Sequence, residues 1–251
     1  MTTLLDLLDA GVTRYGDHGA LALRLDDGST TGWTYRELAR RSRIAAWRLR
    51  ALDLEPGDRI LTWSPSTPEL PAAYYGAMAA RLVLVPLDLR MSPAAVEGIV
   101  KASGARHLIL GTGRDAPDPR EAGLERFPTT TVEALCAEPA PDDPAFPPDW
   151  EARQAAWTRP TDQEVFELVF TSGTTGTPKG VTLTHDNVVA SIESFHRIVP
   201  PMEHRLVSLL PLSHLLEQAV GLYYALDVGA TSSTSAAGTR GSSSTRCATS
   251  A

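Results

Sequence analysis

Residues 170–181 read F-T-S-G-T-T-G-T-P-K-G-V, a run rich in glycines and hydroxyl side chains with one lysine, Lys179. An apolar run at 165–170 precedes it, and an amphipathic pattern with helical spacing follows at 186–198. Glycines allow the backbone to turn so that several N–H groups face one anion, and a lysine adds a mobile positive charge. The run therefore predicts a polyphosphate-binding loop that follows a strand.

The spacing of this loop excludes a Walker motif. That motif requires G-x-x-x-x-G-K-[ST], whereas here Pro178 precedes Lys179 and Gly180 follows it. A glycine-rich loop without function is the alternative interpretation. We disfavour it because the whole run follows a specific order of residues, not merely a composition.

The segments around the loop predict an α/β fold. Helical and strand patterns alternate, which is typical of a parallel sheet with helices on its faces. Thr34 and Glu37 form a capping box, and Ser92 with Pro93 marks a second helix start. We predict strands at 59–64, 82–85, 106–110, 165–170 and 205–210, and helices after residue 34 and at 69–80, after 92, 186–198 and 215–226.

Composition excludes several classes of protein. The chain has 251 residues, 43% hydrophobic and 21% charged, so it is not disordered throughout. Its formal charge of −7 argues against a nucleic-acid partner, which would require an excess of Lys and Arg on one face. Cys136 and Cys247 are far apart, which favours free thiols over a disulfide or zinc site.

No segment reads as a targeting or transmembrane sequence. The longest apolar stretch, at 72–87, is interrupted by Gly76, Arg81 and Pro86 and is too short to cross a bilayer. We therefore expect a cytoplasmic protein without a transmembrane segment, and its oligomeric state stays open. We assign no metal ligand within the chain.

Two segments depart from the alternating pattern. Residues 111–163 are rich in Pro, Asp, Glu and Ala, which predicts an irregular surface excursion. Residues 230–251 contain no Leu, Ile, Val, Phe, Tyr or Trp and cannot bury enough apolar area to offset the entropy of ordering. We interpret them as a non-native or disordered Ser/Thr/Ala tail.

The loop resembles the signature T-S-G-T-T-G-x-P-K-G of AMP-forming acyl-CoA synthetases, in the adenylate-forming superfamily. Residues 34–38 resemble the T-Y-x-E-L of that family, and residues 75–88 resemble its G-A-x-x-A-G-x-x-x-V-P-L-D, with Arg81 where glycine is usual. Residues 211–214 resemble the next motif, and residues 210–218 are most similar to long-chain fatty-acid members. The resemblance covers residues 1–229.

The resemblance implies an incomplete N-terminal large domain of the adenylate-forming fold and an acid–thiol ligase. ATP and a carboxylate, here a fatty acid, would give an acyl-adenylate and pyrophosphate, and coenzyme A would then give the thioester and AMP. ATP, Mg²⁺ and coenzyme A are the implied cofactors. His214 is implied near the acyl and coenzyme A channel, with a packing role as its alternative. The family position carries an ATP-phosphate-binding role to Thr171, Ser172, Gly173, Thr174, Thr175, Gly176 and Lys179.

Later motifs of that family are missing. The sequence has no Y-G-x-T-E segment for the metal-binding glutamate, no Y-x-T-G-D segment for the ribose, and no C-terminal domain with a catalytic lysine. We therefore expect a truncated ligase that is catalytically incomplete. The alternatives are a fragment of an acyl-AMP ligase, a fragment of a peptide-synthetase adenylation domain, or a non-catalytic nucleotide-binding module.

The tail admits a further hypothesis, a slip of the reading frame. A DNA segment can be written that encodes DVVYLRSRHPRIIFDALRD and that, after loss of its first nucleotide, encodes TSSTSAAGTRGSSSTRCA. The second sequence is the one observed at residues 231–248. On this hypothesis Cys247 and the Ser/Thr richness have no function.

Overall fold

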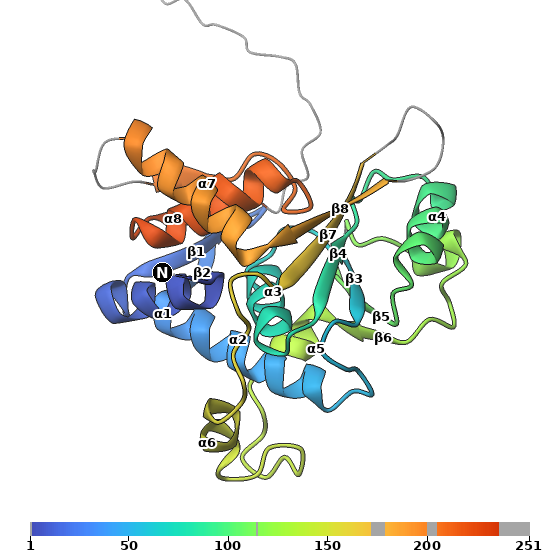
Figure 1. The fold of residues 1–251 in the computed structure, drawn as a ribbon, viewed down its shortest axis with the longest axis horizontal. Coiled ribbons are helices and arrows are strands. Elements are labelled where there is room, and N and C mark those ends of the chain that lie inside the picture. Colours follow the sequence, from blue (N-terminus) through green and yellow to red (C-terminus); the bar gives the residue numbers. More distant parts are fainter. Residues whose placement is uncertain (1, 114, 172–178, 200–204, 236–251) are drawn as a thin grey trace, which may run out of the picture.

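The strands predicted between residues 59 and 110 form the centre of a mostly parallel sheet. The computed structural model describes residues 2–113, 115–171, 179–199 and 205–235, and the strands within these ranges form two sheets. All neighbours in the larger sheet are parallel except β7 and β8 (Figure 1). This confirms the predicted α/β class. The larger sheet has the order β6-β5-β3-β4-β7-β8, with bounds Thr129–Thr131, His107–Leu110, Arg59–Trp63, Val83–Pro86, Val165–Thr171 and Lys179–Thr184.

The smaller sheet joins segments from the two ends of the chain. Strands β1 and β2 form an antiparallel hairpin, while β10 pairs in parallel with β1 on one side and with β9 on the other. Strand β9 is shorter than the strand predicted at 205–210. The order is β2-β1-β10-β9, with bounds Thr30–Thr34, Gly19–Arg24, Thr231–Ser235 and Arg205–Val207.

Helices begin where the capping residues predict. The Thr34 amide donates to Glu37 Oε2 at 2.7 Å and the Glu37 amide donates to Thr34 Oγ1 at 3.2 Å, so the predicted capping box starts α2. The Ser92 hydroxyl caps α4 by accepting from the Ala95 amide, with Pro93 in the first turn of the helix. The principal helices are α1 (Leu4–Tyr15), α2 (Tyr35–Arg50), α3 (Glu69–Ala79), α4 (Pro93–Ser103) and α7 (His185–Ile198).

Helix α3 lies at the centre of the core. Every residue from Leu70 to Met78 is buried, which explains why its sequence lacks a polar face. Gly76 brings α3 close to α2, because a Cβ atom there would lie 2.7 Å from the Ala45 Cβ atom. The helix predicted at 215–226 follows β9 in the chain. It consists of a π-helix, η2 (Glu217–Tyr224), and a short α-helix, α8 (Ala225–Asp227).

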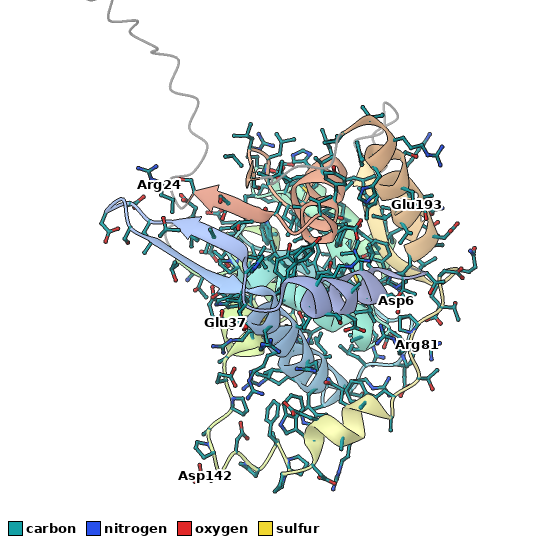
Figure 2. All side chains as sticks on the ribbon, turned by 90° about the vertical axis from the view of Figure 1, so that its left-hand side faces the viewer. Asp6, Arg24, Glu37, Arg81, Asp142 and Glu193 are labelled. Atoms are coloured by element: carbon teal, nitrogen blue, oxygen red, sulfur yellow. The ribbon has the colours of Figure 1, made fainter. Side chains whose placement is uncertain are left out.

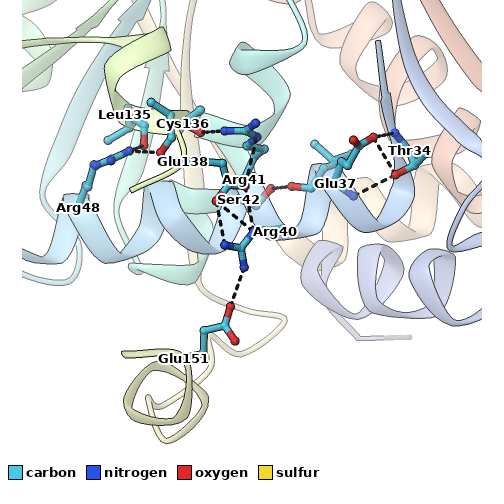
Figure 3. Close-up of polar contacts among 12 residues, drawn as sticks. Thr34, Glu37, Arg40, Arg41, Ser42, Arg48, Leu135, Cys136, Glu138 and Glu151 are labelled. Carbon is cyan, nitrogen blue, oxygen red and sulfur yellow. Dashed lines mark hydrogen bonds and ion pairs between the residues drawn. The ribbon is translucent and has the colours of Figure 1, made fainter. Parts of the chain in front are cut away.

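The segment 111–163 contains more regular structure than the sequence analysis indicated. It forms η1 (Pro119–Ala122), β6, α5 (Val132–Cys136) and α6 (Trp150–Ala155). Arginines of α2 hold it: Arg40 donates to Glu138 at 2.8 Å and to Glu151 at 3.0 Å, and Arg48 donates to the Leu135 carbonyl at 3.0 Å (Figure 3). These partners are distant in sequence, so periodicity did not reveal them. We call residues 137–158 of this segment the arm; Asp142 lies far out on it (Figure 2).

The expectation that residues 230–251 form no regular element is corrected at their start. Residues 231–235 form β10, whose backbone pairs with strands on both sides. The Tyr35 hydroxyl donates to the Ala230 carbonyl at 3.0 Å and holds the chain as it enters the strand. Backbone hydrogen bonds need no apolar side chain, which is why composition missed the strand. Residues 236–251 lie outside the described ranges.

Arg81 adopts a backbone conformation that favours glycine. Its φ is +61°, in the left-handed region, at the position where the related family usually has glycine. Its guanidinium donates to both carboxylate oxygens of Glu164, at 2.9 and 3.1 Å. Arg81 precedes β4 and Glu164 precedes β7, so this ion pair joins the amino ends of two paired strands. We infer that the ion pair offsets the backbone strain.

This inference predicts a coupling between the two residues. We expect Glu164→Gln to lower the free energy of unfolding by about 1 kcal/mol, since it weakens a two-pronged, partly buried ion pair. Arg81→Gly should change it by less than about 1 kcal/mol, because relief of the left-handed strain offsets the lost pair. In the background of the Arg81→Gly variant, Glu164→Gln should cost little. Urea unfolding of the four proteins measures this, and an equal cost of Glu164→Gln in both backgrounds would contradict it.

Candidate functional site

The predicted phosphate loop connects β7 to β8. Thr171, the last residue of β7, pairs with Lys179, the first residue of β8, so the two residues close the connection. The Lys179 side chain is exposed. Ser172, Gly173, Thr174, Thr175 and Gly176 lie outside the described residues, as does the side chain of Thr171. The structure thus places both ends of the loop at the carboxyl end of a strand in a mainly parallel sheet, where α/β proteins bind ligands.

His214 lies at the end of a turn that precedes η2, and it faces the segment after β4. Its Nε2 atom is 3.0 Å from Asp88 Oδ2 and 3.1 Å from Arg90 Nη2. Strand β4 is the parallel neighbour of β7. Asp88 and the phosphate loop therefore follow the carboxyl ends of adjacent strands, and His214 reaches the same edge of the sheet from a different element.

The charges around His214 determine which role its Nε2 atom can take. Arg90 can only donate a hydrogen bond, and an ionised Asp88 can only accept one. An Nε2 atom that carries a proton can therefore bond Asp88 but not Arg90, and an Nε2 atom without a proton can bond Arg90 but not Asp88. The Arg90 side chain donates to Asp88 at 3.1 and 3.0 Å, and these hydrogen bonds hold the pKa of Asp88 below its usual range. Asp88 is therefore an ionised acceptor, suited to a proton on His214 Nε2.

A buried carboxyl group lies behind this edge, and the sequence analysis did not identify it. Glu167 in β7 is fully buried and accepts a hydrogen bond from Gln218 Nε2 at 2.6 Å. The same Nε2 atom donates to the Leu212 carbonyl at 3.0 Å. The pair therefore joins the strand that enters the phosphate loop to the turn that carries His214. A glutamate within the otherwise apolar run 165–170 was the available signal.

Glu167 is the protonated member of this pair at acidic and near-neutral pH. Burial raises its pKa to about 7, and the Gln218 hydrogen bond only partly offsets that. Its second oxygen, Oε2, and the Gln218 Oε1 atom are buried without a hydrogen-bond partner among the described residues. Both are acceptors, so a proton on Oε2 supplies the donor that this pair lacks.

His185 has a packing role. It is buried, its Nδ1 atom accepts from the Leu4 amide at 3.4 Å, and its ring stacks on Phe166 with 5.0 Å between ring centres. Burial lowers its pKa to about 4, so it is neutral at physiological pH. Thr184 caps α7 by accepting a hydrogen bond from the Asn187 amide.

A mainly apolar pocket lies beside this site. It opens between the smaller sheet, the turn before α3 and η2. Its lining includes Leu212, two residues before His214. Leu21 and Leu222 also line it, together with polar residues that include Glu217, Ser232 and Thr234. In the described part of the chain, no three His, Cys, Asp or Glu side chains come together as metal ligands, and no helix is long and apolar enough to span a membrane.

The comparisons with known proteins agree with this arrangement. The family model described as AMP-binding enzyme matches residues 8–248, so the chain belongs to the AMP-binding enzyme family. The chain is 25% identical over 258 aligned residues to a long-chain-fatty-acid–CoA ligase of Escherichia coli O157:H7, covering 90% of the chain and 45% of the relative. It is 32% identical over 213 residues to the long-chain-fatty-acid–CoA ligase FadD15 of Mycobacterium bovis, covering 79% and 34%.

A solved structure supports the fold. The fatty acyl-adenylate ligase from L. pneumophila, determined with acyl adenylate and pyrophosphate, superposes with a TM-score of 0.73 at 19% identity, covering 94% of the chain and 40% of that protein. The chain thus spans less than half the length of these relatives. Within the AMP-binding enzyme family it corresponds to part of the large domain, as the sequence analysis expected.

Glu167 gives the site a testable pH dependence. Because folding raises its pKa, the unfolded chain releases this proton at lower pH than the folded protein does. Its contribution to stability is complete below the ordinary value of 4.5 and is lost as pH rises to about 7. His185 acts in the opposite direction between about 4 and 6.5, so wild type must be compared with Glu167→Gln.

We expect the two proteins to have similar unfolding free energies at pH 5. At pH 8 Glu167→Gln should be the more stable by roughly 3 kcal/mol, because its amide satisfies Gln218 without a buried charge. Urea unfolding between pH 5 and 8 measures this. Parallel pH profiles of the two proteins would show that Glu167 does not titrate in this range.

Proposed function

We propose that the working protein is an AMP-forming acyl-CoA ligase for long-chain fatty acids. It would join ATP and a carboxylate into an acyl-adenylate with release of pyrophosphate. It would then transfer the acyl group to the thiol of coenzyme A, with release of AMP. The observation that carries the proposal is the connection between β7 and β8, which has a phosphate-binding sequence and begins at the carboxyl end of a sheet strand.

The loop would act by placing charge. In the first step a carboxylate oxygen attacks the α-phosphorus in line with the departing pyrophosphate, and negative charge grows on the pyrophosphate oxygens. Backbone N–H groups and hydroxyls of residues 171–176, with the Lys179 ammonium group, would hold the β- and γ-phosphates and stabilise that charge. Positioning of the two reactants supplies the rest of the acceleration.

The ends of the loop are compatible with this role. Lys179 is exposed, and among the described residues it has no ion pair that would occupy its charge. Family membership also implies Mg²⁺, which would neutralise phosphate charge. The described residues bring together no set of carboxylates that could hold it.

A fatty acid is the carboxylate that the sequence favours, because residues 210–218 are most similar to long-chain fatty-acid members. The relatives from Escherichia coli O157:H7 and Mycobacterium bovis are named as long-chain-fatty-acid–CoA ligases. His214, whose Nε2 atom lies 3.0 Å from Asp88 Oδ2, would stand at the entrance to the acyl and coenzyme A channel.

Three other activities are compatible with the same loop. An acyl-AMP ligase or a peptide-synthetase adenylation domain would share the first step and differ in the acceptor. A nucleotide-binding module without catalysis would bind ATP and release no pyrophosphate. The similarity of residues 210–218 to long-chain fatty-acid members favours the coenzyme A ligase. Thioester formation from supplied acyl-adenylate and coenzyme A distinguishes it from the others.

We propose further that the 251-residue chain does not by itself catalyse either step of this reaction. It spans less than half the length of its curated relatives, and it holds the phosphate loop without the ribose and metal motifs. A cytoplasmic location fits an enzyme whose substrates are ATP and coenzyme A. The proposed substrates are a fatty acid, ATP and coenzyme A, and we propose no nucleic-acid partner.

Lys179 provides the direct test. Lys179→Ala should weaken ATP binding to the chain about tenfold or more, because a charge-assisted hydrogen bond contributes roughly 1.5–3 kcal/mol. The only other lysine, Lys101, lies on α4 and pairs with Glu97, so Lys101→Ala is a matched control that should bind as wild type does. Isothermal titration of ATP into the three proteins measures this. Equal affinity of all three proteins for ATP would show that Lys179 does not bind the phosphates.

A further inference from the structure

Strand β10 has a sequence that does not suit its place in the fold. It is an interior strand, paired in parallel with β1 and β9: Ser232 lies opposite Leu21 on one side and Leu206 on the other. Interior strands of parallel sheets are nearly continuous runs of Val, Ile and Leu, because both of their faces are covered. Residues 231–235 are Thr-Ser-Ser-Thr-Ser. No other interior strand among the described residues lacks apolar side chains.

The side chains of β10 also do not match the apolar residues around them. Ser232 is buried, and Ser232 and Thr234 share one face of the strand because side chains alternate. Both line the pocket beside Leu21, Leu212 and Leu222. Larger apolar side chains at these two positions would occupy the space that the hydroxyls leave open.

The genetic code connects this mismatch to a reading frame. Threonine is encoded by ACN, and serine by TCN or by AGT and AGC, where N is any base; we take the TCN codons for serine. Consider the frame in which each codon takes the third base of the preceding codon and the first two of its own. Threonine positions then become NAC, which encodes Tyr, His, Asn or Asp, and serine positions become NTC, which encodes only Phe, Leu, Ile or Val. If the serines at 232, 233 and 235 use TCN codons, these three residues are apolar in that frame whatever the third bases are.

The same rule extends through the tail. The serines at 242–244 become NTC codons, and Cys247 becomes NTG, which encodes Leu, Met or Val. With a CGN codon for Arg240, positions 236–241 take codons for Gly, Arg, Ser, Cys, Pro, Thr, Ala, Trp or one of the NAC residues. Positions 242–244 and 247 are apolar, and among them 243, 244 and 247 have helical spacing. With TCN serine codons the shifted frame therefore encodes an apolar strand, a mainly polar segment and an apolar cluster compatible with one face of a helix, the order of elements typical of an α/β fold.

We propose that residues 231–249 are an out-of-frame reading of the segment that forms β10 and the following helix in the working protein. One missing nucleotide before codon 231 produces the observed sequence, and DVVYLRSRHPRIIFDALRD is one in-frame form. Its second and fourth residues place Val at position 232 and Tyr at 234, the two positions that line the pocket. The inference concerns the sequence of the chain and holds whether or not the ligase proposal is correct.

The gene and two insertion variants test this. Sequencing across codons 225–251 should find TCN at the serine positions and no stop codon in the shifted frame through codon 249. A stop codon there, or AGY serine codons within 231–235, would overturn the proposal. Insertion of one nucleotide before codon 231 should give a protein with a higher melting temperature and a sharper transition. Insertion of three nucleotides, which keeps the observed frame, should give no gain.

Point variants test the strand alone. Ser232→Val combined with Thr234→Tyr should raise the melting temperature of the 251-residue chain by several degrees, because each buries apolar surface in the pocket. Thr31→Val is the control, since Thr31 is an exposed strand position on β2 and tests β propensity without burial. A lower melting temperature in the double variant, or an equal gain in the control, would contradict the proposed apolar β10.

Discussion

The parallel pairing of β4 with β7 is the constraint on which the site depends. It joins segments that are about 80 residues apart and sets Leu84 opposite Glu167. At the amino ends of the two strands, Arg81 and Glu164 form their two-pronged ion pair. At the carboxyl ends, Asp88 and the phosphate loop leave the sheet on the same edge. A shift of this register would change how Thr171, at the start of the loop, lies relative to Asp88, the partner of His214.

A second connection reaches the site from inside the core. Gln218 donates to Glu167 in β7 and to the Leu212 carbonyl in the turn before His214. The neutral state of Glu167 matters here, because none of the described residues places a cation beside this fully buried carboxyl group. The pair thus couples the strand that enters the phosphate loop to the segment that would face the acyl group.

Much of this could be predicted from local sequence. Thr34 with Glu37 and Ser92 with Pro93 specify helix starts through their own hydrogen bonds, and the alternation of helix and strand specifies the parallel sheet. What failed depended on distant partners. Residues 111–163 are held by arginines of α2, and the buried Glu167 takes its hydrogen bond from Gln218, a residue far along the chain. Strand β10 was missed because its side chains disagree with a backbone position that the neighbouring strands impose.

Hydrogen exchange of the 251-residue chain, with and without ATP, tests the central claim most directly. If the β4–β7 pairing brings the phosphate loop and the His214 turn to one edge, ATP should slow exchange in peptides covering 171–180 and in those covering 86–90 and 210–216. Peptides of α4 and of the arm around Asp142 should exchange unchanged. Protection confined to other regions, or no protection at 171–180 at saturating ATP, would contradict the account.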